Sequence, residues 1–264
     1  MPTVREIEQA LFALAPFELA MGGDNVGHLL GDPEQEVDRV LVALDITEDV
    51  AAEAIEEDCQ LIVAHHPVMN CKWLPVQSVR SDRPQGHLLL QLLRNYVSAI
   101  CMHTNLDCTA GGVNDVLASR LELEDVEIPD PTSPIRIGHI DEPVEDLREF
   151  VDFVCGALGC NGVRFADAGK PVYRVAVGGG ACGDFEDDVI AAGCDTFVTA
   201  DLSYHQFLDA KGKGINLIDA GHFPTEDPVC EILIAYLTEQ FPELTVMKAA
   251  SHREVVEYYI EGEK

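Results

Sequence analysis

Apolar positions along the chain fall into short runs that alternate with segments of helical spacing. A mainly apolar run at residues 39–46 is followed by a helical segment at 51–59 and a second run at 61–64. Another helical segment around 87–96 leads to a third run at 97–102. Continuous apolar runs joined by helices are typical of parallel strands that are covered on both faces.

The N-terminal segment predicts one helix and one loop. Thr3 and Glu6 have the spacing of a capping box, which opens a helix to about Leu14 that Pro16 ends. The glycine-rich residues 21–33 are expected to form a loop. Thr47 predicts the N-cap of the helix between the first two strands.

The second half of the chain repeats the alternation. After a helix at 113–121, residues 122–134 are rich in acids and prolines and predict a domain boundary. Strands are then expected at 135–140, 163–165, 174–177, 196–199 and 215–218, with helices at 144–158, after Asp184 and after Asp201. The predicted fold class is α/β, with two α/β domains, mostly parallel sheets and a metal site in the cleft at the carboxyl ends of the strands.

The C-terminal segment contains two prolines that bear on its helix. Because Pro228 is tolerated only in a first turn, we predict Thr225 as the N-cap, Glu226 as the first helical residue and His222 as a loop residue. The helix is expected to run to about residue 240, with closing strands at 244–248 and 255–260.

Side chains that bind metals follow several of the predicted strands. His65 and His66 come directly after the run at 61–64, and Asp107, His222 and Glu226 lie at or beyond later strand ends. Three imidazoles and two carboxylates suit Zn, Fe, Mn or Co, and five ligands exceed one closed tetrahedral site. The pattern therefore predicts two divalent transition-metal ions per chain. The alternative for each histidine alone is a hydrogen-bonded structural role.

Two further histidines are candidates for acid/base catalysis. His103 and His205 follow strand ends, and hydrolysis needs a group that protonates the leaving atom. A structural role is an equal alternative for each. The glycines at 178–180 are expected to form a tight turn, because no basic residue follows them to support an anion site.

Charge and composition narrow the class of protein. The chain has 47 acidic and 17 basic residues and a formal net charge of -30, which favours a halophilic protein and makes nucleic acid an improbable partner. No apolar stretch is long enough for a membrane helix, and no signal pattern is present, so a cytoplasmic protein is expected. The nine cysteines lack metal-knuckle spacing and are expected to be mostly free and buried.

Six segments together resemble a known family. They are GDNVG at 23–27, AHHP at 64–67, HTNLD at 103–107, GGVND at 111–115, VTADLSYHQ at 198–206 and LIDAGHFPTE at 217–226. The chain resembles the GTP cyclohydrolase 1 type 2 homologues, also called Nif-three-like proteins. It departs from them at Gly23, where tryptophan is frequent, and at His28, where an aliphatic residue is expected.

The resemblance implies a toroidal homohexamer with a dinuclear metal site facing its central cavity. It implies that residues 1–127 together with about 222–264 form one domain, which carries the ligands, and that 128–221 form the second. Carried over by motif, the implied ligands are the five residues already chosen: His65, His66, Asp107, His222 and Glu226.

Three functions are compatible with this site. The first is a metal-dependent hydrolase that uses metal-bound hydroxide on a small-molecule, nucleotide-like substrate, with His103 or His205 donating the proton. The second is a metal-trafficking or cofactor-assembly protein that carries iron or zinc. The third is a non-enzymatic oligomeric adaptor. The sequence shows no cluster of Arg or Lys near the motifs for a triphosphate, so whether the protein is an enzyme stays open at this point.

Overall fold

The computed structural model describes residues 1–69 and 78–259, and the chain divides into two compact units. Unit 1 consists of Met1–Gly112 and Val229–Arg253, and unit 2 of Val113–Pro228 and Glu254–Lys264. Unlike the predicted domain ranges, this division assigns residues 113–127, 222–228 and 254–264 to unit 2. Among the described residues, no helix is long and apolar enough to cross a membrane.

Unit 1 is a five-stranded sheet with the order β1-β4-β3-β2-β11. The strands are β1 (Gly27–Leu30), β2 (Arg39–Ala43), β3 (Leu61–Ala64), β4 (Ser98–Cys101) and β11 (Thr245–Lys248), and its helices are α1 (Val4–Leu14), η1 (Phe17–Leu19), α2 (Glu48–Glu56), α3 (Pro84–Arg94), α4 (Thr104–Cys108) and α10 (Val229–Gln240). Strands β11, β2, β3 and β4 are parallel, and β1 pairs antiparallel with β4. The predicted parallel core of this half is confirmed.

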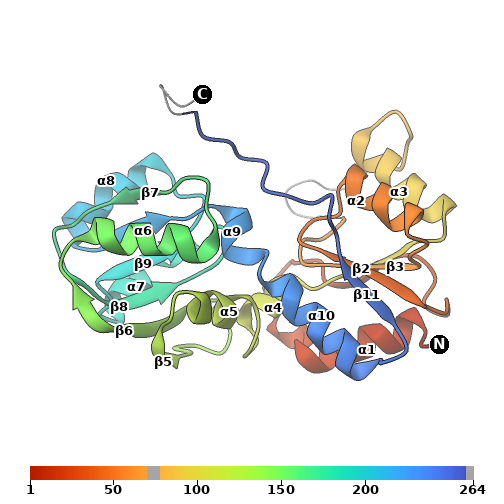
Figure 1. The fold of residues 1–264 in the computed structure, drawn as a ribbon, viewed down its shortest axis with the longest axis horizontal. Coiled ribbons are helices and arrows are strands. Elements are labelled where there is room, and N and C mark those ends of the chain that lie inside the picture. Colours follow the sequence, from red (N-terminus) through yellow and green to blue (C-terminus); the bar gives the residue numbers. More distant parts are fainter. Residues whose placement is uncertain (70–77, 260–264) are drawn as a thin grey trace. The chain divides into compact units, whose positions relative to one another are not determined.

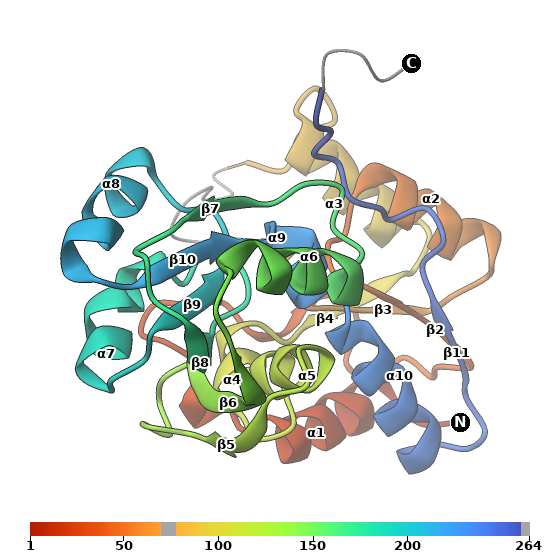
Figure 2. The same cartoon turned by 60° about the vertical axis from the view of Figure 1, so that its left-hand side comes forward.

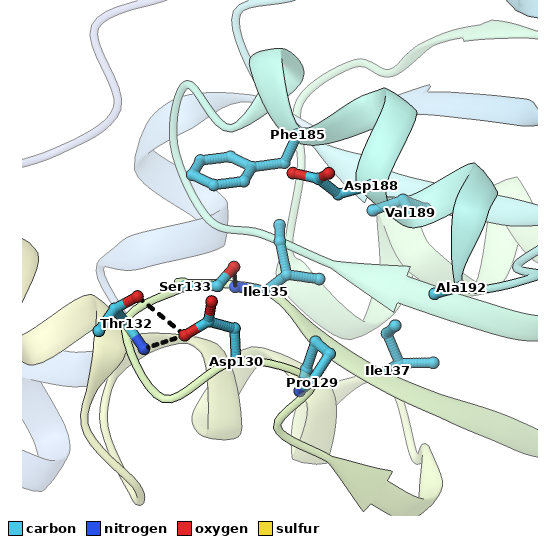
Figure 3. A pocket seen from close by; sticks show the side chains of 10 residues that line it. All are labelled: Pro129, Asp130, Thr132, Ser133, Ile135, Ile137, Phe185, Asp188, Val189 and Ala192. Atoms are coloured by element: carbon cyan, nitrogen blue, oxygen red, sulfur yellow. Dashed lines mark hydrogen bonds between the residues drawn. The ribbon is translucent and has the colours of Figure 1, made fainter.

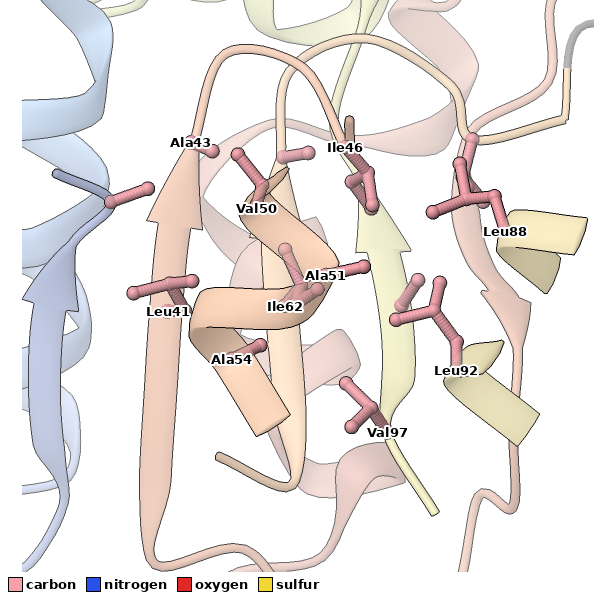
Figure 4. Close-up of a cluster of buried hydrophobic side chains, with 14 of the residues drawn as sticks. Leu41, Ala43, Ile46, Val50, Ala51, Ala54, Ile62, Leu88, Leu92 and Val97 are labelled. Carbon is pink, nitrogen blue, oxygen red and sulfur yellow. The ribbon is translucent and has the colours of Figure 1, made fainter. Parts of the chain in front are cut away.

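Helices cover both faces of this sheet, as its continuous apolar strands predict. Side chains of α2 and α3, including Val50, Ala54 and Leu92, pack on Leu41 and Ile62 on one face (Figures 1 and 4). The alternate strand residues are also fully buried, and α1 and α10 lie against β1, β2 and β11. The capping box that opens α1 and the Thr47 cap of α2 are both present.

Unit 2 is a six-stranded sheet with the order β5-β6-β8-β9-β10-β7. The strands are β5 (Glu124–Glu127), β6 (Arg136–Val144), β7 (Arg164–Ala166), β8 (Val172–Val177), β9 (Thr196–Thr199) and β10 (Asn216–Asp219), and the helices are α5 (Val113–Arg120), α6 (Leu147–Leu158), η2 (Gly183–Phe185), α7 (Glu186–Ala191), α8 (Tyr204–Lys213) and α9 (His222–Glu226). The central strands β8, β9 and β10 are parallel, and the outer pairs are antiparallel. The predicted α/β class, with two sheets built around parallel strands, is confirmed.

Helices α5, α6, α7 and α8 lie around this second sheet (Figure 2), and two apolar clusters pack beneath them. Helices α5 and α6 contribute Leu117, Phe150 and Val154 to one cluster, whereas α7 and α8 contribute Val189 and Ala210 to the other. Eight cysteines lie among the described residues, and six of them are buried. Burial raises the pKa of Cys101 to about 12, which keeps this thiol protonated, as expected for a core residue.

Two predicted elements in these sheets are wrong, and a strand lies where a domain boundary was expected. The loop predicted at 21–33 contains β1, and the boundary predicted at 122–134 contains β5, which belongs to the sheet of unit 2. Both strands lie at sheet edges, where tertiary pairing outweighs a weak local pattern. Residues 255–259 form no strand, and residue 260 of that prediction lies outside the described residues.

A hollow of about 320 Å³ lies in unit 2, between β6 and α7 (Figure 3). Its lining is Pro129, Asp130, Thr132, Ser133, Ile135, Ile137, Phe185, Asp188, Val189 and Ala192. None of the predicted site residues is among them.

Candidate metal centre

His65 and His66 lie just beyond the end of β3, with their rings side by side. Their amides donate to the carbonyls of Ala43 and Leu44, which continues the pairing with β2 for two residues. The chain bends at both histidines, and their ring centroids are 4.9 Å apart. Adjacent side chains in a regular strand would point to opposite faces. The predicted departure from strand geometry is therefore confirmed.

The hydrogen bond of His65 determines which of its nitrogens can bind a metal. The side chain is fully buried, and Nδ1 lies 2.8 Å from the carbonyl oxygen of Met102. Because a carbonyl can only accept, Nδ1 carries the proton and Nε2 carries the lone pair. Nε2 is 3.5 Å from Oδ1 of Asp107, which α4 carries.

His66 is oriented in the same way by a carboxylate. Its Nδ1 lies 2.7 Å from Oδ1 of Asp45, whose Oδ2 lies 3.0 Å from Nε2 of His252. Burial raises the pKa of Asp45, but the bonds from His252 and His66 outweigh it and hold that pKa well below its ordinary value. An ionised Asp45 accepts from Nδ1 of His66, which directs the lone pair to Nε2.

His103 joins these two histidines. It is the N-cap residue of α4, and its Nδ1 lies 2.8 and 2.9 Å from the two carboxylate oxygens of Asp24. Asp24 also accepts from the amide and the hydroxyl of Thr104; burial raises its pKa, but these bonds leave the pKa well below its ordinary value. One ring nitrogen each from His65, His66 and His103 lies within 4.8 Å of the other two.

Unit 2 contains two further side chains that could hold a metal ion, and both lie on α9. Nδ1 of His222 lies 2.8 Å from Oδ2 of Asp201, and Nε2 lies 2.9 Å from Oε2 of Glu226. The Glu226 side chain is 5% exposed, whereas that of His222 is 35% exposed. The pair therefore offers one imidazole and one carboxylate oxygen from a single helical turn.

The prediction that His222 is a loop residue and Thr225 an N-cap is wrong. His222 and Glu226 share one short helix, which follows Gly221 with a φ of 89°. Pro224 lies in the first turn, where a missing amide hydrogen costs no hydrogen bond. The Thr225 hydroxyl lies within hydrogen-bond distance of the Gly221 and His222 carbonyls, as expected inside a helix.

The glycines after β8 form the turn that the sequence predicts. This turn lies against α9. A Cβ on Gly180 would lie 2.1 Å from Oε1 of Glu226 and 3.0 Å from Nε2 of His222. The amides of Gly179 and Gly180 donate to Asn114 Oδ1 and Thr225 Oγ1. These amides therefore hold protein side chains and not an anion.

His205, the other acid/base candidate, is exposed in the first turn of α8. Its ring centroid lies 5.5 Å from that of Tyr204. It is not among the histidines that gather near His65.

The donor set fits transition metals. Nδ1 of His65 and of His66 lies close to an oxygen acceptor, which leaves Nε2 as the ligand atom. His103 is held in the same way by Asp24, and His222 has carboxylate oxygens at both ring nitrogens. Mixed imidazole and carboxylate donors suit Zn, Fe, Mn and Co. Sequence reasoning assigned no role to Asp24 or to His252, because neither stands at the end of a predicted strand. Only the three-dimensional contacts identify them.

The chain is similar to known proteins over most of its length. The model of the Duf34/NIF3 (NGG1p interacting factor 3) family matches residues 2–254. A protein of Streptomyces coelicolor named GTP cyclohydrolase 1 type 2 homolog is 36% identical over 251 residues, covering 90% of this chain and 87% of that protein. A protein of the same name from Clostridium perfringens is 34% identical over 222 residues, covering 82% and 84%.

Solved structures have the same fold. Staphylococcus aureus protein SA1388 aligns with a TM-score of 0.88 at 26% identity and covers 98% of this chain and 99% of its own. A Bacillus cereus protein related to NIF3 aligns with a TM-score of 0.90 at 21% identity, again over 98% and 99%. The second likeness supports the fold alone.

Proposed function

Since the chain belongs to the Duf34/NIF3 family, we propose that it binds two divalent transition-metal ions and acts as a hydrolase. The proposed ligands are His65, His66, Asp107, His222 and Glu226. The observation that carries the proposal is the group of three imidazoles in unit 1, whose ring nitrogens lie within 4.8 Å of one another. Each Nδ1 in this group faces an oxygen acceptor, which is the arrangement of metal-binding histidines.

The metals would supply Lewis acidity and lower the pKa of a bound water, which gives a nucleophile at neutral pH. His103 is the proposed proton donor. Asp24 accepts from Nδ1 of His103 and from the Thr104 hydroxyl, so Nε2 is the nitrogen of His103 that would deliver a proton to the leaving atom. His205 is the second proposed donor.

The proposed substrate is nucleotide-like, which follows from the name of the relatives, GTP cyclohydrolase 1 type 2 homolog. With a net charge of -30 the protein attracts no polyanion at long range. A substrate of low negative charge is therefore favoured over a triphosphate, and a homo-oligomer, in the form of a toroidal hexamer, is the proposed assembly.

A metal carrier is the second candidate function. The His222 side chain is 35% exposed and that of His66 21% exposed, so two of the ligands are accessible to an exchanging partner. A carrier would release its metal to a weak chelator, whereas a hydrolase would retain it through turnover.

Elemental analysis tests the metal proposal. The full chain, purified at molar salt without chelator, is expected to hold about two transition-metal ions. His65→Ala and Glu226→Ala should lose metal, while His87→Ala, which removes an exposed histidine from α3, should retain it. Equal metal content in all four proteins, or none in the wild type, would overturn the proposal.

A hydrolysis screen then separates the two functions. Nucleotides of different charge are incubated with the metal-loaded wild type and with His103→Gln at molar salt. The hydrolase proposal expects turnover that falls about 100-fold or more in the variant. A metal-loaded protein that turns over no nucleotide but gives its metal to a weak chelator would be a carrier.

A further inference from the structure

We infer that His252 is a positioning residue for the metal centre, which acts through Asp45 on His66. The inference rests on the proposed metal role of His66. All three residues belong to unit 1, so their contacts are internal to one compact body.

Asp45 connects the two histidines through separate oxygens. Oδ1 accepts from Nδ1 of His66 at 2.7 Å, and Oδ2 lies 3.0 Å from Nε2 of His252. A carboxylate held by one bond can still rotate about its Cβ–Cγ axis, whereas two bonds on opposite oxygens fix its plane. His252 therefore fixes the direction in which Asp45 accepts from His66, and with it the direction of Nε2 of His66.

The C-terminal segment is built to deliver His252 to this position. β11 pairs in parallel with β2, and the amide of Ala249 donates to the carbonyl of Val42 at 2.8 Å. The carboxylate of Glu53, on α2, then accepts from the amides of Ala250 and Ser251, both at 2.8 Å. Three successive residues are thus fixed immediately before His252.

The side chain of His252 is almost completely buried. It is 8% exposed, although both neighbours in the chain are exposed. A buried imidazole needs a polar partner, and Asp45 supplies it. The catalytic scheme above uses no proton of His252, so orientation of the ligand is the role that remains.

Two substitutions of similar size separate hydrogen bonding from packing. His252→Gln keeps an N–H that can donate to Asp45, and His252→Met fills the space without a donor. Zinc affinity of the full chain is measured by competition titration with a chromophoric chelator. We expect His252→Met to lower this affinity about tenfold and His252→Gln to stay near the wild type. His87→Ala is the control and should bind as the wild type does.

A second measurement needs no metal. In the metal-free protein, long-range ¹⁵N spectra of histidine side chains report which ring nitrogen carries the proton. His66 should be a single Nδ1-protonated tautomer in the wild type and in His252→Gln, and a mixture of tautomers in His252→Met.

The outcomes are distinct. Wild-type affinity and an unchanged His66 spectrum in His252→Met would overturn the inference. If no protein binds zinc, the proposed function fails, and the tautomer spectra alone decide whether His252 positions His66. If Met and Gln weaken zinc binding equally, packing and not the hydrogen bond is the contribution of His252.

Discussion

A histidine can bind a metal only through a ring nitrogen that carries a lone pair. An acceptor beside one nitrogen holds the proton there and leaves the lone pair on the other. In this protein the acceptor beside Nδ1 is the carbonyl of Met102 for His65 and a carboxylate for His66, His103 and His222. For His65, His66 and His103 this choice favours Nε2, whereas His222 has a second carboxylate, that of Glu226, at Nε2. The sequence places the histidines at strand ends but holds no local signal for these partners, which come from distant parts of the chain.

His139, which is not a proposed ligand, also has acceptors at both ring nitrogens. Nε2 lies 3.1 Å from Asp125 and Nδ1 lies 3.2 Å from the Ile140 carbonyl. The bond to Asp125 and then that to Ile140 raise the pKa of His139 above its ordinary value. The doubly protonated ring is therefore favoured in the folded state.

The His139–Asp125 pair predicts a small pH dependence of the free energy of unfolding. Because the folded-state pKa is raised, the stabilisation is fully present below the unfolded-state pKa and is lost as the pH rises through the folded-state pKa. Asp125→Asn should lower the pKa of His139 in an NMR titration, while Asp152→Asn, an exposed change on α6, should leave it unchanged. An unaltered titration in Asp125→Asn would refute the assignment.

At the level of elements, the turn of three glycines after β8 packs closely against helix α9. Gly180 has a φ of 62°, and no side chain fits between it and Glu226. We expect Gly180→Ala to displace the Glu226 carboxylate and to reduce metal content toward that of Glu226→Ala.

Gly193→Ala is the matched control for this prediction. Gly193 also has a positive φ, of 82°, but a Cβ there meets nothing within 4 Å. Both variants carry the backbone strain of about 1 kcal/mol or more, so urea unfolding should show a loss of stability in both. Loss of metal in both variants, or in neither, would show that the close approach of Gly180 is unimportant.

The elements that could be predicted are those with strong periodicity. The parallel strands β2, β3 and β4 and the capped helices α1 and α2 follow from apolar runs and cap residues. The edge strand β1 could not be predicted, because its partner β4 is distant in sequence. β5 could not be predicted, because its four residues are exposed, three of them are acidic, and they form no apolar pattern. α9 was missed because a five-residue helix with a proline in its first turn leaves no periodic signal.

At the scale of the whole molecule, the net charge of -30 sets the response to salt. Self-repulsion among the acidic side chains destabilises the folded chain at low ionic strength, and the Debye length falls from about 10 Å at 0.1 M to about 3 Å at 1 M. We expect the melting temperature to rise by several degrees between 0.1 and 2 M NaCl.

Calorimetry in sodium chloride and in sucrose checks this expectation. Sucrose stabilises without screening charge, so only the salt series should rise steeply at low concentration and then level off. A melting temperature that is equal at 0.1 and 2 M NaCl would contradict the prediction of a salt-adapted protein.

The chain passes between its two units after Gly112, after Pro228 and after Arg253. During synthesis, the ribosome releases β2, β3 and β4 long before β11, which pairs with β2 across some two hundred residues. Most of unit 2 has been synthesised by then, while the β2 edge of the unit 1 sheet is still unpaired. The sheet begun first is thus the last to be completed, and the nascent chain carries β2 with one unpaired edge through most of its synthesis.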